Sequence, residues 1–70
     1  MVNIQLLKDK IDDSGMTKVA VCEKAGILRQ TLYNRFDNPN FTLEEIDGLK
    51  RALHLTSRDV QRIFFAQNVQ

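Results

Sequence analysis

Apolar residues recur at helical spacing in the first part of the chain, and each group stops at a small residue. Residues 4–11 carry an apolar stripe with charged residues outside it, and Ser14-Gly15 follows where this helix is expected to end. Thr17 is placed as the N-cap of a second helix that runs to about Ala25. Gly26 comes next, where a left-handed residue can stop the helix. The pattern therefore predicts two short helices in this part of the chain.

Turn and capping signals divide the rest of the chain into three more helices. A third helix is expected over Arg29 to Phe36, and the sequence Asp-Asn-Pro-Asn at 37–40 must end it. Thr42-Leu43-Glu44-Glu45 is a capping box that starts a fourth helix. The same signal at residues 56–59 predicts a fifth helix over about 57–67. The predicted fold class is all-α, with five short helices.

The chain has 70 residues, of which 43% are hydrophobic and 27% are charged. These values are typical of one globular domain, which we expect to span residues 1–70. A core of this size stabilises a protein only marginally unless its helices pack in an idealised way or a second chain shares it, so a homodimer is consistent with this length. The sequence shows no signal peptide, and no stretch approaches the roughly 20 apolar residues of a membrane span. We expect a cytoplasmic protein that does not contact a membrane.

The single cysteine and the single histidine offer little for catalysis or metal binding. Cys22 cannot form an internal disulfide, and we interpret it as a small buried residue between the second and third helices, with a redox sensor as the alternative. His54 has no ligand partner at suitable spacing and is expected on the surface. The sequence pairs no nucleophile with a base and has no Gly-rich phosphate loop. We therefore expect no enzyme activity, metal, cofactor or small-molecule substrate.

Charge is unevenly distributed, although the net charge is only +1. Residues 17–36 hold four basic residues and one acidic residue, whereas residues 37–48 hold four acidic residues and no basic one. The low net charge argues mildly against a nucleic-acid-binding protein. A local basic patch can nevertheless contact phosphates, while the acidic neighbour is expected to weaken sequence-independent binding.

Residues 17–36 combine two predicted helices, a glycine at their junction and local positive charge. This is the layout of a helix-turn-helix that binds DNA. In the second of these helices, apolar residues four apart share one face and polar residues cluster on another. One face can pack against the domain, and the other can contact bases.

The order of these parts resembles the Cro and phage-repressor type of helix-turn-helix protein, often called the XRE family, over nearly the whole chain. The resemblance rests on small or apolar packing residues and the turn glycine, namely Val21, Cys22, Ala25, Gly26, Ile27 and Leu32. The stretch RQTLYNRFDNPNFTLEEIDGLKRALHLT, followed by DVQRIFF, is similar to small regulators encoded by phages and prophages of low-GC Gram-positive bacteria. The resemblance implies a lambda-repressor-like domain that binds double-stranded operator DNA as a homodimer and regulates transcription.

The resemblance also implies a set of DNA contacts. The third helix would enter the major groove with five residues near the bases, namely Leu28, Arg29, Gln30, Tyr33 and Asn34. The expected phosphate contacts are Thr17, Lys18, Arg35, Asn38, Asn40 and Thr42. Two positions depart from the family pattern. Leu28 stands where the family often has a polar N-cap, and Arg35 stands where many members have an apolar residue.

The side chains of the third helix suit base recognition. Arg29 offers a fork that matches O6 and N7 of guanine, while Gln30 and Asn34 offer paired donors and acceptors that match N6 and N7 of adenine. Tyr33 can stack on a sugar, touch a thymine methyl group or donate to a phosphate. The alternative interpretation is an ordinary solvated helix face, because exposed helices commonly carry these residue types. The glycine turn and the packing pattern favour base contact for Arg29 and Gln30, and leave both interpretations open for Tyr33 and Asn34.

Two features of the later helices leave alternatives open. Gly48 lies inside the fourth helix and indicates either a close contact with another helix or simple tolerance. Phe64 and Phe65 differ by about 100° around a helix, so one small domain cannot easily bury both. We expect Phe64 in the core and Phe65 with Val69 at a homodimer surface, the alternative for Phe65 being a partly covered surface ring.

A second class of function is consistent with the exposed aromatic ring and the low net charge. The same fold could serve as a protein-interaction module, such as the partner-binding part of an antirepressor or an antitoxin. Salt-dependent binding to duplex DNA distinguishes a DNA-binding regulator from such a module.

Overall fold

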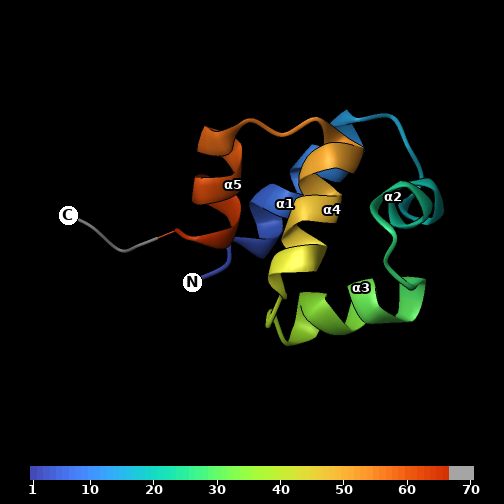
Figure 1. Ribbon diagram of the computed structural model, residues 1–70, viewed down its shortest axis with the longest axis horizontal. Coiled ribbons are helices and arrows are strands. Elements are labelled where there is room, and N and C mark those ends of the chain that lie inside the picture. The colour runs from blue at the N-terminus through green and yellow to red at the C-terminus, as the bar shows by residue number, and fades with distance from the viewer. Residues whose placement is uncertain (67–70) are drawn as a thin grey trace.

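The computed structural model describes residues 1–66 and has five α-helices over that range (Figure 1). They are α1 (Ile4–Asp13), α2 (Lys18–Ala25), α3 (Arg29–Asp37), α4 (Leu43–Leu53) and α5 (Ser57–Phe64). The described residues contain no β-strand, so the all-α prediction is confirmed. The predicted end of the fifth helix near residue 67 is wrong, because Phe65 already leaves helical backbone angles (φ -123°, ψ 27°).

Polar side chains cap α2, α4 and α5 as the sequence predicts. The Thr17 hydroxyl accepts a backbone hydrogen bond at the start of α2. Both capping boxes are present, with Thr42 and Glu45 at α4 and Thr56 and Asp59 at α5. Such a cap stabilises a helix by about 1 kcal/mol. By contrast, α3 begins without any side-chain hydrogen bond to its N-cap residue.

Three residues with left-handed backbone angles end helices or make turns. Gly15 (φ 76°) follows α1, and Gly26 (φ 74°) follows α2, as the sequence predicts. His54 ends α4 with φ 54°, and it is the only non-glycine residue with positive φ in the part of the chain that the structure describes. Its side chain is exposed, as predicted, but its left-handed conformation is not evident from the sequence.

The core lies around α4: α1, α2, α4 and α5 supply its main cluster of buried side chains, and α3 buries Leu32. Figure 1 shows α4 in the middle, α5 and α2 on opposite sides of it, and α3 along the lower edge. The buried residues that form the core are Leu7, Ile11, Val21, Ala25, Ile46, Leu49, Ala52, Leu55, Ile63 and Phe64. Phe64 is therefore in the core, as expected, and its ring meets that of Phe41 edge-on with centroids 5.1 Å apart.

Gly48 allows α2 and α4 to approach closely. A Cβ atom built on Gly48 would lie 2.2 Å from the carbonyl oxygen of Ala25, which is backbone and cannot rotate away. Of the two interpretations that the sequence leaves open, close helix contact is therefore the right one. The contact holds the end of α2, and with it the turn into α3, against the middle of α4.

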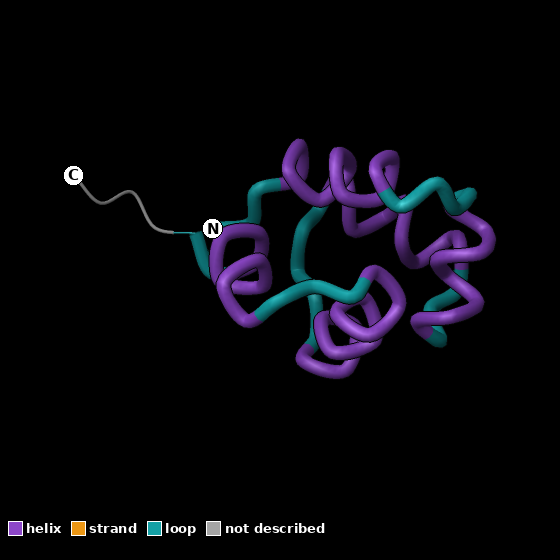
Figure 2. Tube along the Cα trace, turned by 90° about the horizontal axis from the view of Figure 1, so that it is seen from above, coloured by secondary structure: helices purple, strands orange, loops and turns teal. Residues whose placement is uncertain are grey.

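The first residues of the chain are held against α5 and the residue after it. The Asn3 N–H donates to the Ile63 carbonyl oxygen (2.6 Å), and the Met1 amino group donates to the Ala66 carbonyl oxygen (3.0 Å). Lys10 and Asp59 form an ion pair at 3.5 Å between α1 and α5. Figure 2 shows the N-terminal residues beside α5. Within residues 1–66, no helix is long and apolar enough to cross a membrane.

Candidate nucleic-acid interface

The turn between α2 and α3 is short and ordered by backbone hydrogen bonds. The left-handed Gly26 ends α2, and the Ile27 N–H donates to the Cys22 carbonyl oxygen (3.0 Å). Leu28 is the N-cap of α3, and its carbonyl oxygen accepts from the Leu32 N–H (3.0 Å). In Figure 1, α2 is seen nearly end-on while α3 runs across the view, so the chain turns sharply here.

Most of the surface of α3 faces away from the core. Leu32 is the only residue of α3 that is fully buried, and Phe36 is half-buried against the core. One face of α3 therefore holds the helix to the domain. The rest of its surface is free to contact another molecule.

The five residues predicted to lie near bases are all exposed on α3 or at its N-cap. They are Leu28 (75% exposed), Arg29, Gln30, Tyr33 (44% exposed) and Asn34. Gln30 and Asn34 lie one turn apart, and the Gln30 Nε2 donates to the Asn34 Oδ1 (3.2 Å). The two amides therefore act as one unit, with the Gln30 oxygen and the Asn34 nitrogen still available to a partner.

Tyr33 leans toward the side of the helix that faces α1. Its ring meets that of Phe36 edge-on at 6.0 Å, and the Lys8 ammonium lies 5.1 Å from the Phe36 ring centroid. A shallow hollow joins these groups with residues from α1 and α2, and it is lined by Gln5, Lys8, Asp12, Lys18, Tyr33, Phe36 and Asp37. Sequence reasoning overlooked Lys8, because its proximity to α3 depends on how α1 packs rather than on spacing along the chain.

The six residues predicted to contact phosphates are dispersed around α3, and within residues 1–66 five of them have no competing side-chain ion pair. Lys18 lines the hollow beside Tyr33, and Asn38 and Asn40 are exposed in the loop after α3. The hydroxyls of Thr17 and Thr42 accept backbone hydrogen bonds as caps. Each hydroxyl can still donate its proton to an anion.

Arg35, also predicted to contact a phosphate, has an intramolecular partner. Its Nε donates to the Glu45 Oε1 (2.9 Å), and its Nη2 donates to the Glu45 Oε2 (3.1 Å). The two side chains are 26% and 16% exposed, respectively. The hydrogen bonds from Arg35 hold the pKa of the Glu45 carboxyl below its ordinary value, against the opposing effect of burial. Glu45 therefore pairs with Arg35 in addition to capping α4, and only the cap is predicted from the sequence.

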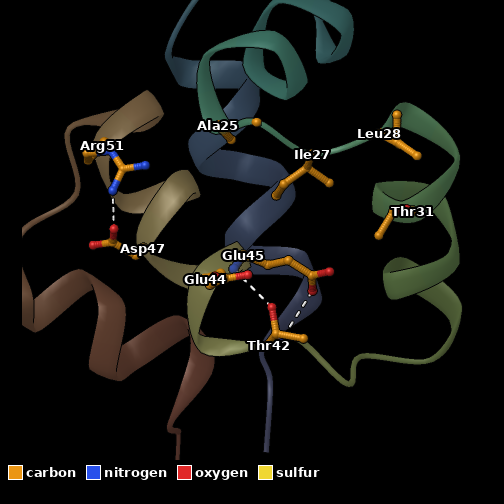
Figure 3. A pocket seen from close by; sticks show the side chains of 10 residues that line it. Ala25, Ile27, Leu28, Thr31, Thr42, Glu44, Glu45, Asp47 and Arg51 are labelled. Carbon is orange, nitrogen blue, oxygen red and sulfur yellow. Dashed lines mark hydrogen bonds and ion pairs between the residues drawn. The ribbon is translucent and has the colours of Figure 1, made fainter.

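An acidic cleft separates the turn into α3 from the first turns of α4 (Figure 3). It is lined by Ala25, Gly26, Ile27, Leu28, Thr31, Thr42, Glu44, Glu45, Asp47 and Arg51. Asp47 forms an ion pair with Arg51 across one turn of α4. Because Glu45 is paired with Arg35 in addition, arginines offset much of the negative charge of this cleft.

Cys22 is buried, with 4% of its surface exposed, at the position expected for a small packing residue. Burial raises the pKa of the Cys22 thiol, while the positive charge of Arg29 acts in the opposite direction. A buried thiol of raised pKa is poorly reactive, because the thiolate is the reactive form. Within residues 1–66, no group of three or more His, Cys, Asp or Glu side chains is placed to hold a metal ion.

Comparison with known proteins identifies no relative: no family model, no curated protein and no solved structure matches this chain.

Proposed function

We propose that this protein is a sequence-specific DNA-binding regulator of transcription, in which α2 and α3 act as a helix-turn-helix of the lambda-repressor type. The observation that carries the proposal is the exposure of Arg29, Gln30 and Asn34 together on α3, directly after a left-handed glycine turn. In this proposal α3 enters the major groove of an operator, and the residues around it contact the backbone. The protein acts in the cytoplasm without a cofactor and resembles small phage or prophage regulators.

The side chains on α3 supply the chemistry for reading bases. Arg29 can pair with guanine through two parallel hydrogen bonds, and each such bidentate contact discriminates against a wrong base by about 1 to 3 kcal/mol. The hydrogen bond between Gln30 and Asn34 restricts both amides before DNA arrives, which lowers the conformational entropy lost on binding. Lys18, Asn38 and Asn40 flank the helix and would fix its orientation on the phosphates.

The test is a titration of the protein into DNA from around its own gene, with unrelated duplex as competitor, at two salt concentrations. The double variant Arg29→Ala, Gln30→Ala is expected to lose competitor-resistant binding, because it removes the guanine fork and one adenine-reading amide. The loss should exceed tenfold, since two contacts of about 1 to 3 kcal/mol each disappear.

The matched control is the double variant Arg58→Ala, Gln61→Ala, which removes the same two residue types from exposed positions on α5. It changes the net charge equally and should bind the operator as the wild type does. Weak binding that neither variant alters, or no binding to any duplex, would contradict the proposed function.

The regulator is proposed to act as a homodimer on a palindromic operator. Phe65 is 49% exposed directly after α5 and supports a role in that interface, whereas Val69, its predicted companion, lies outside the described residues. In sedimentation, the variant Phe65→Ala is expected to shift the protein toward the monomer, because it removes an exposed aromatic ring from the contact. An unchanged dimer population would remove Phe65 from the interface.

A protein-interaction module on the same fold is the second candidate, similar to an antirepressor or an antitoxin. The exposed side chains of Phe65 and Leu43 favour it, because such apolar surface is typical of partner contacts. The DNA titration separates the two functions, since a module of this kind would show no salt-dependent preference for any duplex.

A further inference from the structure

The Glu45 carboxylate joins three parts of the molecule. Its two oxygens accept from the Arg35 guanidinium on α3, and Oε1 also accepts from the Thr42 backbone N–H (3.0 Å) at the end of the loop after α3. Figure 3 shows Glu45 and Thr42 hydrogen-bonded to each other at the start of α4. One side chain thus links α3, the loop at 38–42 and α4.

We propose that Arg35 and Glu45 position α3 relative to the loop at 38–42, and that Arg35 acts through Glu45 rather than by contacting a phosphate. This inference rests on the proposed function. The base-reading residues lie on α3, and the backbone contacts Asn38, Asn40 and Thr42 lie in the loop or at its end. The ion pair therefore sets the distance between the part that reads bases and the part that holds the phosphates.

The weak attachment of α3 makes such a device necessary. Only Leu32 anchors the helix by full burial, and the N-cap of α3 makes no side-chain hydrogen bond. In the described part of the chain, the only side-chain hydrogen bonds between α3 and α4 are the two from Arg35 to Glu45. Apolar packing leaves a helix free to slide or rotate by small amounts, whereas a planar two-bond fork fixes its direction.

The geometry of the pair favours a positioning role over a general electrostatic one. Both side chains are largely covered, so their interaction is less screened than that of an exposed pair. The guanidinium meets the carboxylate through two parallel bonds, which a lysine ammonium cannot reproduce. Operator binding should therefore be sensitive to a substitution at Arg35 or Glu45 that changes the shape of the side chain, even when its charge is kept.

Two conservative variants test the inference from opposite sides of the pair. Glu45→Asp keeps the charge and the helix cap, since Asp59 makes the same capping box in α5, but it withdraws the carboxylate from Arg35 by one methylene. Arg35→Lys keeps the charge but removes the fork. Glu44→Asp, one position earlier and exposed, is the matched control for the shortened acid.

Each variant is titrated with an operator selected from a random duplex library by the wild-type protein, and with an unrelated duplex, at several salt concentrations. Glu45→Asp and Arg35→Lys are each expected to weaken operator binding by about tenfold or more, because one misaligned base contact has that effect. Binding to the unrelated duplex and the salt dependence should stay as in the wild type and in Glu44→Asp. Thermal unfolding confirms that all variants are folded at the titration temperature.

Other outcomes overturn the inference. If Arg35 contacts a phosphate directly, Arg35→Lys will bind the operator nearly as the wild type does, and Arg35→Ala will weaken both duplexes alike while lowering the salt slope by about one. Unchanged operator binding by Glu45→Asp also rules out a positioning role. A wild-type protein that selects no sequence from the library overturns the proposed function, and this inference with it. The wild-type selection thus tests the function, and the variants test the pair.

Discussion

The variant Gly48→Ala is expected to destabilise the protein by about 3 kcal/mol, at the upper end for overpacking in a core. Helix propensity alone predicts the opposite, because alanine is favoured over glycine inside a helix by about 1 kcal/mol. The clash decides the sign: a Cβ at this position would lie 2.2 Å from the Ala25 carbonyl oxygen, so α2 and α4 must separate. The change in the free energy of unfolding can be measured by urea denaturation followed by circular dichroism.

Gly26→Ala is the matched comparison for this experiment. A Cβ on Gly26 meets nothing within 4 Å, and the only penalty is the left-handed backbone conformation (φ 74°). That conformation costs an L-residue about 1 to 2 kcal/mol. The protein should therefore tolerate Gly26→Ala better than Gly48→Ala. A Gly48→Ala variant as stable as the wild type would show that α2 and α4 do not pack as described.

Leu32→Ala is the second substitution with a large expected effect, a loss of about 2 to 5 kcal/mol in the free energy of unfolding. Leu32 has 0% of its surface exposed and is the only fully buried side chain of α3, so no neighbour in that helix can compensate for its loss. A domain of this size has only about 5 to 15 kcal/mol to lose, and small ones lie near the lower limit. Amide hydrogen exchange should show α3 losing protection before α4 does.

Leu43→Ala makes the same chemical change at an exposed position. Leu43 is 75% exposed at the start of α4, and surface substitutions of this kind alter stability by no more than about 0.5 kcal/mol. Similar losses for the two variants would mean that α3 is not anchored through Leu32. If only Leu32→Ala lowers the free energy of unfolding, the result supports Leu32 as the residue that holds α3 to the domain and leaves the opposite face of the helix exposed.

The five helices could be predicted from the sequence because their signals are local. Apolar spacing marks the buried stripe of a helix, and the threonines at 17, 42 and 56 mark three starts within a few residues of the atoms they bind. The end of α5 could not be predicted in this way. The sequence Ile-Phe-Phe-Ala continues a helical pattern, but the carbonyl oxygen of Ala66 is held by the amino group of Met1, which lies 65 positions away in the sequence.

In the candidate site, too, the features that depend on local sequence could be predicted and those that depend on tertiary contacts could not. Exposure of Arg29, Gln30 and Asn34 follows from which face of α3 is apolar, and that is visible in the sequence. The pairing of Arg35 with Glu45 is not, because the two residues are 10 positions apart and meet only through the turn between two helices. Without knowledge of that turn, the sequence shows only an arginine on a basic helix and a glutamate in an acidic stretch. Each is then expected to face solvent or a ligand rather than to pair with the other.

The hydrogen bonds from Met1 and Asn3 to the residues at and after the end of α5 also affect how the protein folds during synthesis. Chains leave the ribosome N-terminus first, at about 5 to 20 residues per second. Residues 1–13 are therefore made several seconds before residues 63 and 66, whose carbonyl oxygens accept hydrogen bonds from Asn3 and Met1. During that interval α2, α3 and α4 can form their local contacts, while the apolar face of α1 lacks its final cover. The packing of these five helices is thus completed by α5, which is made after the other four.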